Sequence, residues 1–327
     1  MNVVATANPF RFHGGRLAAA AAHFADAPAP WIDLSTGISP WAYPVPDMVP
    51  SVLSRLPEPE ELGRLEAVAA SAFGVTNPAE VVAVPGSDIA IRLLGSLFPG
   101  QRSAMLTPIY SGHIAAWPDA AEISMAEADK HDLLILANPN NPDGRVIDPD
   151  RLRQLRGQLI VDEAFADTDP MVSLLPERGD AIVLRSFGKF FGLAGMRLGF
   201  VIADLPVAQR LRALLGDWPV SGIAMATGLA AYQDEHWQDK QRTRLRGAVV
   251  RLDGLLKNAG LKVVGGTSLF RLTIHDKSPE IFEYLGQSGI LVRPFEGDDR
   301  QLRFGLPANE EAWNRLTDAL NYWRENQ

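Results

Sequence analysis

Between residues 81 and 203, short apolar runs alternate with amphipathic stretches, and this alternation limits the possible folds more than any other feature of the chain. We expect a helix after Gly86 that extends to Phe98 and another over Tyr110–Trp117. The predicted strands are Val81–Val84, Ala104–Thr107, Leu133–Ala137, Leu159–Val161, Ile182–Leu184 and Gly199–Ala203. Apolar strands that alternate with helices indicate an α/β fold with a largely parallel sheet covered on both faces. Because ligands of such sheets bind beyond the carboxyl ends of the strands, we expect the polar clusters found there to form one site.

The flanking parts of the chain have different patterns. Residues 1–60 are rich in proline but also carry apolar residues such as Trp31, so we interpret them as an irregular, extended arm that packs on another surface, such as a partner subunit. Spacing of apolar residues predicts a helix over 61–73. Beyond residue 235 we expect helices over 235–259, through Gly286 and over 309–324, with strands Lys262–Val264, Leu269–Ile274, Ile290–Val292 and Leu302–Phe304. This pattern indicates a smaller α+β domain. The predicted segments are an N-terminal arm (1–45) that joins the small domain, a large domain (46–234) and a small C-terminal domain (235–327).

Composition excludes several classes of protein. The chain has 327 residues, of which 46% are hydrophobic and 21% charged, as in ordinary globular proteins. It contains no cysteine, so disulfides, thiolate metal sites and a cysteine nucleophile are excluded, and we expect no metal at the site. The formal net charge of −8 disfavours binding to nucleic acids or anionic membranes, since both need a basic face. The N-terminus lacks a secretory pattern and no apolar run approaches a membrane span, so we expect a cytoplasmic protein.

The most distinctive segment, RSFGKFFGLAGMR, runs from Arg185 to Arg197. It contains a single lysine, Lys189, among glycines and aromatic residues. A lysine held among apolar groups is poorly solvated, which favours the neutral amine, and a neutral amine can form a Schiff base with an aldehyde cofactor. Ser186 and Arg197 offer the hydroxyl and guanidinium needed to hold a phosphate. The segment therefore predicts pyridoxal 5'-phosphate (PLP) bound covalently at Lys189. The alternative is a surface lysine in a glycine-rich loop.

PLP chemistry needs particular partners, and the ends of the predicted strands offer them. Asp162 ends a buried run and could face the pyridine nitrogen, which must stay protonated for the ring to act as an electron sink; by itself, it could instead cap a helix. Asn141 is placed to donate a hydrogen bond to the ring oxygen O3'. Backbone amides of Ser87 and Asp88, at a helix N-terminus, could bind the phosphate, although the Asp88 carboxylate could instead cap that helix. Tyr110 could stack on the ring or belong to the core.

Three motifs, in this order, resemble those of the class I/II aminotransferase superfamily of PLP enzymes (fold type I). They are NPNNPDG over 138–144, VDEAF over 161–165 and SFGKFFGLAGMRLGF over 186–200. The resemblance extends from about residue 13 to the C-terminus. It implies a large domain with a mainly parallel seven-stranded sheet, a small domain built from both chain ends, and a homodimer with sites near the interface. It also implies that Lys189 binds the cofactor covalently, that Asp162 faces the pyridine nitrogen, that Asn141 binds O3' and that Tyr110 lies over the ring. The residues around the phosphate would be Ser87, Asp88, Ser186 and Arg197.

Two subfamilies are close to this chain: the histidinol-phosphate aminotransferases and the threonine-phosphate decarboxylases of cobalamin biosynthesis. His13-Gly14-Gly15 resembles the His-Gly-Gly of the decarboxylases, and Phe165, where aminotransferases have a tyrosine beside O3', is the residue that the decarboxylases have. Three positions depart from the pattern. Gly37 stands where the decarboxylases usually have an asparagine that touches substrate. Leu56 replaces a tyrosine that in relatives reaches the partner subunit's phosphate, and Asp143 replaces a threonine.

The same resemblance implies which residues bind the anionic groups of the substrate. We expect Arg293 and Arg303 to lie two strands apart in the small domain. The resemblance implies that both reach over the cofactor and hold the phosphate and carboxylate of a phosphorylated amino acid, for which the arginine fork is suited. It also implies substrate contacts from His13, Gly14, Gly37 and Asn141.

The resulting hypothesis is decarboxylation of O-phospho-L-threonine to (R)-1-amino-2-propanol O-2-phosphate. The bond at Cα that stands perpendicular to the pyridine plane is the one that breaks, so substrate orientation decides the reaction. In an aminotransferase, the first alternative, the Cα–H bond takes that orientation. The second alternative is a PLP-binding domain without turnover, which would have no need for the group that keeps the ring protonated.

Overall fold

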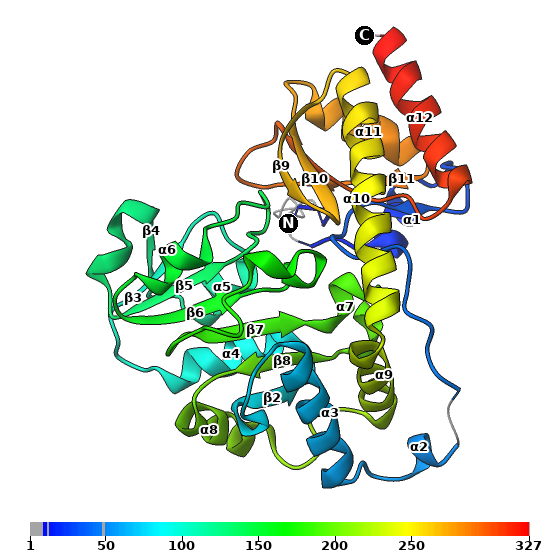
Figure 1. Ribbon diagram of the computed structural model, residues 1–327. Coiled ribbons are helices and arrows are strands. Elements are labelled where there is room, and N and C mark those ends of the chain that lie inside the picture. Colours follow the sequence, from blue (N-terminus) through cyan, green and yellow to red (C-terminus); the bar gives the residue numbers. More distant parts are fainter. Residues whose placement is uncertain (1–8, 12, 48–49, 327) are drawn as a thin grey trace, which may run out of the picture. The chain divides into compact units, whose positions relative to one another are not determined.

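The computed structural model describes residues 9–11, 13–47 and 50–326, and these form two compact units (Figure 1). The larger unit comprises Trp41–Thr243. The smaller unit combines the described parts of Met1–Pro40 and Arg244–Gln327, so both ends of the chain contribute to it. No described helix has the length and apolar composition that crossing a membrane would require.

A seven-stranded sheet forms the centre of the larger unit, with strand order β2-β8-β7-β6-β5-β3-β4. Strand β8 alone runs antiparallel to its two neighbours. The bounds are β2 (Val81–Val84), β3 (Ser103–Leu106), β4 (Ala121–Ile123), β5 (Leu133–Ala137), β6 (Gln158–Asp162), β7 (Ile182–Ser186) and β8 (Gly199–Ile202). All residues of β2, β5, β7 and β8 are buried, as expected for strands covered on both faces. The predicted α/β fold with a mainly parallel seven-stranded sheet is confirmed.

Helices surround this sheet and complete its core. They are α2 (Ser51–Ser54), α3 (Pro59–Ala72), α4 (Ser87–Leu97), α5 (Ser111–Ala116), α6 (Pro149–Arg153), α7 (Phe187–Phe190), α8 (Leu205–Leu215) and α9 (Gly222–Gln233), with α10 (Glu235–Asn258) at the boundary of the units. The 3-10 helices are η1 (Pro78–Glu80), η2 (Met125–Lys130), η3 (Ala166–Thr168), η4 (Pro170–Val172) and η5 (Ala194–Met196). Leu94 of α4 and Leu211 of α8 join Ile160 and Val201 of the sheet in one buried cluster. The sequence pattern does not predict β4, α8 or α9; α9, GIAMATGLAAYQ, has too many apolar residues to show a helical period.

The free edge of the sheet, along β2, is covered by an ion pair. Oε1 of Glu66 accepts the backbone N–H of Ala83 at 2.9 Å, and Nη2 of Arg212 donates to the carbonyl oxygen of Val81 at 2.7 Å. The two side chains also contact each other, with 2.9 Å between Nη2 and Oε2. Because an uncovered edge strand can pair with another chain, this ion pair protects the edge.

The smaller unit contains a four-stranded antiparallel sheet in the order β12-β13-β10-β9 and a parallel pair, β1-β11. Its strands are β1 (Ile32–Asp33), β9 (Lys262–Thr267), β10 (Phe270–Ile274), β11 (Ile290–Leu291), β12 (Arg293–Pro294) and β13 (Gln301–Gly305). Its helices include α1 (Leu17–His23), α11 (Ser278–Gln287) and α12 (Glu310–Glu325).

The prediction of an irregular arm over residues 1–60 is wrong where the structure has α1, β1, α2 and the start of α3. Strand β1 pairs with β11 of the same chain. The rings of Phe10 and Phe24 pack against Phe282 of α11, with centroids 5.5 and 6.1 Å away. Phe10 and Phe24 are therefore buried within the chain itself, which stabilises regular structure around them despite the prolines.

Candidate active site

The predicted cofactor-binding residues of the larger unit lie at one edge of the seven-stranded sheet. Strands β2, β3, β5, β6 and β7 run in the same direction, so their carboxyl ends share that edge, and the antiparallel β8 begins there. The register aligns Ser186 with Gly199, and Gly199 with Val84. The residues that end these strands or flank them at this edge are Ser87, Asp88, Tyr110, Asn141, Asp162, Ser186, Lys189 and Arg197. The topology of the sheet thus gathers residues separated by more than a hundred positions in sequence.

The first turn of α4 and Arg197 form a cradle suited to an anion. Gly86 precedes α4 with a φ of 88°, a left-handed conformation that glycine adopts readily. A Cβ placed on Gly86 would lie 2.6 Å from Nη2 of Arg197, so the guanidinium lies directly against this glycine. A Cβ on Gly199 would lie 2.8 Å from the backbone nitrogen of Ser87, which places the α4 amides beside the start of β8. Amides at a helix N-terminus together with a guanidinium are suited to phosphate binding.

Arg197 has an unusual backbone conformation. It is the one non-glycine residue in the described part of the chain with a positive φ, 51°. Its Nη1 donates to the carbonyl oxygen of Ala194 at 3.2 Å, which anchors the exposed side chain. Left-handed conformations of this kind are uncommon and are found at functional sites, where the surroundings hold them in place.

Asp162 is buried and its two carboxylate oxygens are both engaged. Oδ2 lies 3.0 Å from Nε2 of His113, and Oδ1 accepts the backbone N–H of Ala164 at 3.1 Å. An ionised carboxylate only accepts hydrogen bonds, so the His113 proton is on Nε2. His113 is fully buried and its ring stacks on that of Trp117, with centroids 6.2 Å apart. Sequence reasoning missed His113, since its one signal, a place three residues after Tyr110, does not distinguish it from a core histidine.

Tyr110 is oriented by Asp88. Its hydroxyl donates to Oδ1 of Asp88 at 3.1 Å, and Nε of Arg92 donates to Oδ2 at 3.3 Å. Burial, followed by the nearby charge of Asp88, raises the pKa of Tyr110 to about 12, so the phenol stays neutral. The Asp88 carboxylate does not cap α4, whose N-cap is Gly86 without a side-chain hydrogen bond, so the capping alternative is wrong. The carboxylate of Asp88 is hydrogen-bonded to Tyr110 and Arg92. The group of Asp88 that can bind an anion is therefore its backbone N–H.

Lys189 follows β7 on the short helix α7. Its side chain is half-buried, while Phe187, Phe190 and Phe191 around it are buried. The rings of Phe187 and Phe191 stack with their centroids 4.6 Å apart. The residues that flank Lys189 are therefore buried and apolar.

Two asparagines hold the loop that carries Asn141. The side-chain nitrogen of Asn138 donates to the carbonyl oxygens of Ile147 and Val172, both at 3.0 Å. That of Asn140 donates to Oδ1 of Asp143 at 2.8 Å. Asp143 thus stabilises the loop, and Asn141 itself is half-buried beyond the end of β5.

A buried cluster of charges, also missed from the sequence, fixes the strands that carry the predicted residues. Arg185 on β7 is 4% exposed; its Nη1 donates to Glu163 at 3.1 Å and its Nη2 pairs with Asp167. Burial raises the pKa of Glu163, and the charge of Arg185 opposes that rise. Glu163 directly follows Asp162 and Arg185 directly precedes Ser186. Loss of one partner would leave a buried charge uncompensated, so the cluster constrains both strand ends.

In the smaller unit, Arg293 and Arg303 lie directly opposite each other on the adjacent strands β12 and β13. The expected separation by two strands is wrong, because residues 295–300 form a short connection between the two strands. Arg303 is 3% exposed; its Nη2 donates to the carbonyl oxygen of Ser35 at 3.0 Å and its guanidinium lies 4.9 Å from the Phe270 ring centroid. Burial, followed by the charge of Arg293, lowers the pKa of Arg303 well below its ordinary value. Like charges opposite each other destabilise a sheet, so a bound anion would stabilise this pair.

The predicted substrate residues His13, Gly14 and Gly37 lie in the same unit, whereas Asn141 lies in the larger one. A Cβ on Gly14 would overlap the carbonyl oxygen of Ser35, the atom that binds Arg303. Gly37 follows two residues later and is buried, whereas the His13 side chain is exposed. The fold thus brings Gly14 and the segment before Gly37 to Arg303.

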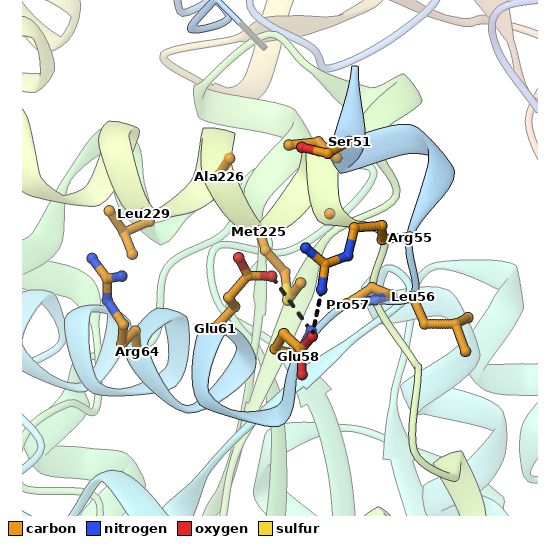
Figure 2. A pocket seen from close by; sticks show the side chains of 12 residues that line it. Ser51, Arg55, Leu56, Pro57, Glu58, Glu61, Arg64, Met225, Ala226 and Leu229 are labelled. Atoms are coloured by element: carbon orange, nitrogen blue, oxygen red, sulfur yellow. Dashed lines mark hydrogen bonds and ion pairs between the residues drawn. The ribbon is translucent and has the colours of Figure 1, made fainter. Parts of the chain in front are cut away.

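A separate pocket of 340 Å³ in the larger unit is lined by residues of α2, α3, α9 and the segment between α2 and α3. Figure 2 shows Arg55 turned toward Glu58, with 3.5 Å between Nη2 and Oε1, and Leu56 pointing away from that pair. The Leu56 side chain is 65% exposed. Leu56, the position at which the resemblance implies a tyrosine, therefore carries an exposed apolar side chain at this pocket.

The chain belongs to the family of class I and II aminotransferases, whose model matches residues 53–320. Within this family it is 41% identical to the threonine-phosphate decarboxylase of Pseudomonas aeruginosa, over 96% of this chain and 98% of that one. It is 38% identical to the threonine-phosphate decarboxylase of a Sinorhizobium species, over 94% and 97%. The solved structure of histidinol-phosphate aminotransferase from Sinorhizobium meliloti, in complex with pyridoxal-5'-phosphate, has the same fold: the TM-score is 0.77 at 21% identity, over 94% of each chain.

Proposed function

We propose that this chain catalyses the PLP-dependent decarboxylation of O-phospho-L-threonine to (R)-1-amino-2-propanol O-2-phosphate in cobalamin biosynthesis. The observation that carries the proposal is the 41% identity to a threonine-phosphate decarboxylase over nearly the full length of both chains. Two features of this chain support it. The opposed Arg293 and Arg303 suit a substrate with two anionic groups, and Phe165 is the residue that the sequence resemblance associates with the decarboxylases.

The residues at the sheet edge fit PLP. The guanidinium of Arg197 against Gly86, beside the first amides of α4, offers donors for a phosphate where a side chain on Gly86 would block it. When bound, PLP supplies an electron sink for the electron pair left at Cα as CO2 departs. Lys189 would hold the cofactor covalently. The groups for its phosphate would be the amides of Ser87 and Asp88, the hydroxyl of Ser186 and the guanidinium of Arg197.

Asp162 would keep the proton on the pyridine nitrogen. It suits that role because His113 and the Ala164 amide hold its carboxylate in one orientation within a buried setting. A fixed, poorly solvated carboxylate stabilises a facing cation more than a solvated one does. Tyr110, held by Asp88, would cover the ring, and Asn141 would donate to O3'.

Recognition of the phosphorylated amino acid would fall to Arg293 and Arg303. A guanidinium can bind a phosphate or a carboxylate through two parallel hydrogen bonds, which fixes the orientation of the bound group. By fixing the phosphate and the carboxylate, the two arginines would set the orientation of the substrate, which decides which bond at Cα breaks. His13, Gly14, Gly37 and Asn141 would complete the substrate contacts.

The reaction can be tested with purified holoenzyme and O-phospho-L-threonine. We expect CO2 release that does not depend on a 2-oxo acid, and a much poorer reaction with L-threonine, which lacks the phosphate. Conversion of histidinol phosphate with 2-oxoglutarate, with phosphothreonine left untouched, would identify an aminotransferase. Borohydride reduction followed by peptide mapping should place the cofactor on Lys189; a label on another lysine contradicts the site.

We also propose a homodimer, the assembly that the resemblance implies. Leu53 and Leu56 support it, because these apolar side chains on and after α2 are 73% and 65% exposed and exposed apolar surface often marks an interface. Light scattering should give a dimer for the parent protein and monomers for a Leu53→Asp, Leu56→Asp variant. Leu205→Asp, at another exposed leucine, is the matched control and should stay dimeric. A monomeric parent protein contradicts the proposal.

A further inference from the structure

Four hydrogen bonds meet at Ser35 in the smaller unit. Its hydroxyl oxygen accepts the backbone N–H of Gly15 at 2.7 Å, and the hydroxyl donates to Oδ1 of Asp33 at 2.6 Å. Its carbonyl oxygen accepts Nη2 of Arg303 at 3.0 Å. Ser35 is 2% exposed, so water does not compete for these groups. The buried Ser35 therefore links three parts of this unit: the Gly14–Gly15 segment, Arg303 and Asp33.

The position of the Ser35 carbonyl is fixed from two sides. On one side, Oδ1 of Asp33 accepts the backbone N–H of Ser35 at 2.9 Å as well as its hydroxyl, so one oxygen orients both the peptide and the side chain. On the other side, Gly14 lies so close that a Cβ there would overlap the carbonyl oxygen. With its proton directed to Asp33, the hydroxyl has only its acceptor capacity left for the turn, and Gly15 uses it.

Arg303 needs such support because of its surroundings. Its guanidinium is buried, faces the like charge of Arg293 and lies 4.9 Å from the centroid of the Phe270 ring. Binding through two parallel hydrogen bonds requires a fixed guanidinium plane. The bond to Ser35 commits one N–H donor and sets that plane before a ligand arrives.

We propose that Ser35 is a positioning residue for substrate recognition, which holds the guanidinium of Arg303 through its carbonyl oxygen and the Gly14–Gly15 turn through its hydroxyl, with Asp33 fixing both. The inference deepens the proposed function and rests on it, because it takes the opposed arginines as the site of the substrate's anionic groups. Asp33 contacts Ser35 and Ser35 contacts the arginine, so both act on the substrate through Arg303.

The test begins with Ser35→Ala holoenzyme. Loss of the hydroxyl should raise both the KM and the Kd for O-phospho-L-threonine by about tenfold, the equivalent of one hydrogen bond of ~1.4 kcal/mol. The kcat and the cofactor content should stay near the parent values. Ser278→Ala is the matched control, since Ser278 is also fully buried in this unit and its hydroxyl donates to the carbonyl oxygen of Arg300 at 2.7 Å. It should leave the Kd unchanged.

A double-mutant cycle separates positioning from a merely structural role. In an Arg303→Ala background, Ser35→Ala should weaken binding by less than about twofold, since the group that it positions is absent. A full tenfold effect in that background, or no effect in the parent background, overturns the inference.

Two aspartate variants test the same network if Ser35→Ala fails to fold. Asp33→Asn keeps an oxygen acceptor for Ser35 without the charge and should bind O-phospho-L-threonine at least as tightly as the parent. Asp33→Ala should weaken binding as Ser35→Ala does. Equal weakening by both variants overturns the role of Asp33.

The cycle is measured with inorganic phosphate as well as with O-phospho-L-threonine. Failure of the parent holoenzyme to bind or decarboxylate O-phospho-L-threonine refutes the proposed function. In that case the positioning role is judged from inorganic phosphate alone. It is supported if Ser35→Ala weakens phosphate binding in the parent background but not in the Arg303→Ala background, and it is overturned if Ser35→Ala has no such effect.

Discussion

Replacing Asp162 with asparagine removes a charge and also sets hydrogen-bond donors against each other. Oδ1 of Asp162 accepts the Ala164 N–H and Oδ2 accepts Nε2–H of His113. Asparagine has one side-chain oxygen, so in either orientation its NH2 group faces one of these donors. If His113 moves its proton to Nδ1 to relieve the conflict, that proton is buried, and Nδ1 has no hydrogen-bond partner among the described residues.

The structure sets the size of the effect. An unsatisfied buried donor costs about 1–3 kcal/mol, and each kcal/mol lowers the unfolding midpoint of a domain of this size by about 2–4 °C. The apoenzyme of Asp162→Asn should therefore unfold several degrees below the parent while keeping its fold. Turnover should fall by at least about tenfold, or ~1.4 kcal/mol of barrier, because the amide cannot hold the pyridine nitrogen protonated.

A second variant separates the two effects. His113→Phe removes the donor opposite residue 162, so in that background the asparagine can keep its oxygen on Ala164 without conflict. Asp162→Asn should then cost little stability, while its loss of turnover remains. Trp117→Phe, which keeps an aromatic ring beside His113, is the control. An equal stability cost in both backgrounds refutes the hydrogen-bond argument, and turnover within about tenfold of the parent makes Asp162 merely structural.

Three further predictions concern the cofactor cradle, the arginine pair and the sheet edge. Gly86→Ala should weaken PLP binding strongly in spectroscopic titration, because the added Cβ meets the Arg197 guanidinium and φ is positive; an unchanged PLP affinity would mean that the cradle does not bind the phosphate. Arg293→Ala and Arg303→Ala should each raise the Kd for O-phospho-L-threonine without lowering PLP affinity, and the double variant should be far worse; loss of PLP instead would contradict their assignment. Burial raises the pKa of Glu66 above its ordinary value of 4.5. The folded protein therefore gains stability from the protonated form below about pH 4.5, and it loses this stability as the pH rises through the raised pKa. Glu66→Gln should remove that loss in thermal unfolding between about pH 4 and pH 7, and an identical pH profile would refute it.

The sequence was sufficient to predict those features of the fold whose pattern lies within a few consecutive residues. The strands Val81–Val84 and Leu133–Ala137 have the bounds that their apolar runs predict. The placement of Asp162 and Lys189 at the ends of β6 and β7 follows from the same alternation, because parallel strands share one carboxyl edge. The family could be recognised from the sequence for a related reason, since its motifs are contiguous.

The tertiary structure alone decided which side chains meet. His113 and Asp162 are 49 residues apart, and Ser35 and Arg303 are 268 apart. Arg293 and Arg303 were expected two strands apart, yet a short connection pairs them directly. Periodicity reports which face of an element is buried, but hydrogen bonds between distant segments depend on register and packing, which are set only when the whole core forms. The sequence therefore determined the sheet, the edge that gathers the predicted site residues, and the family, whereas the partners that orient Asp162 and Arg303 were determined by the fold.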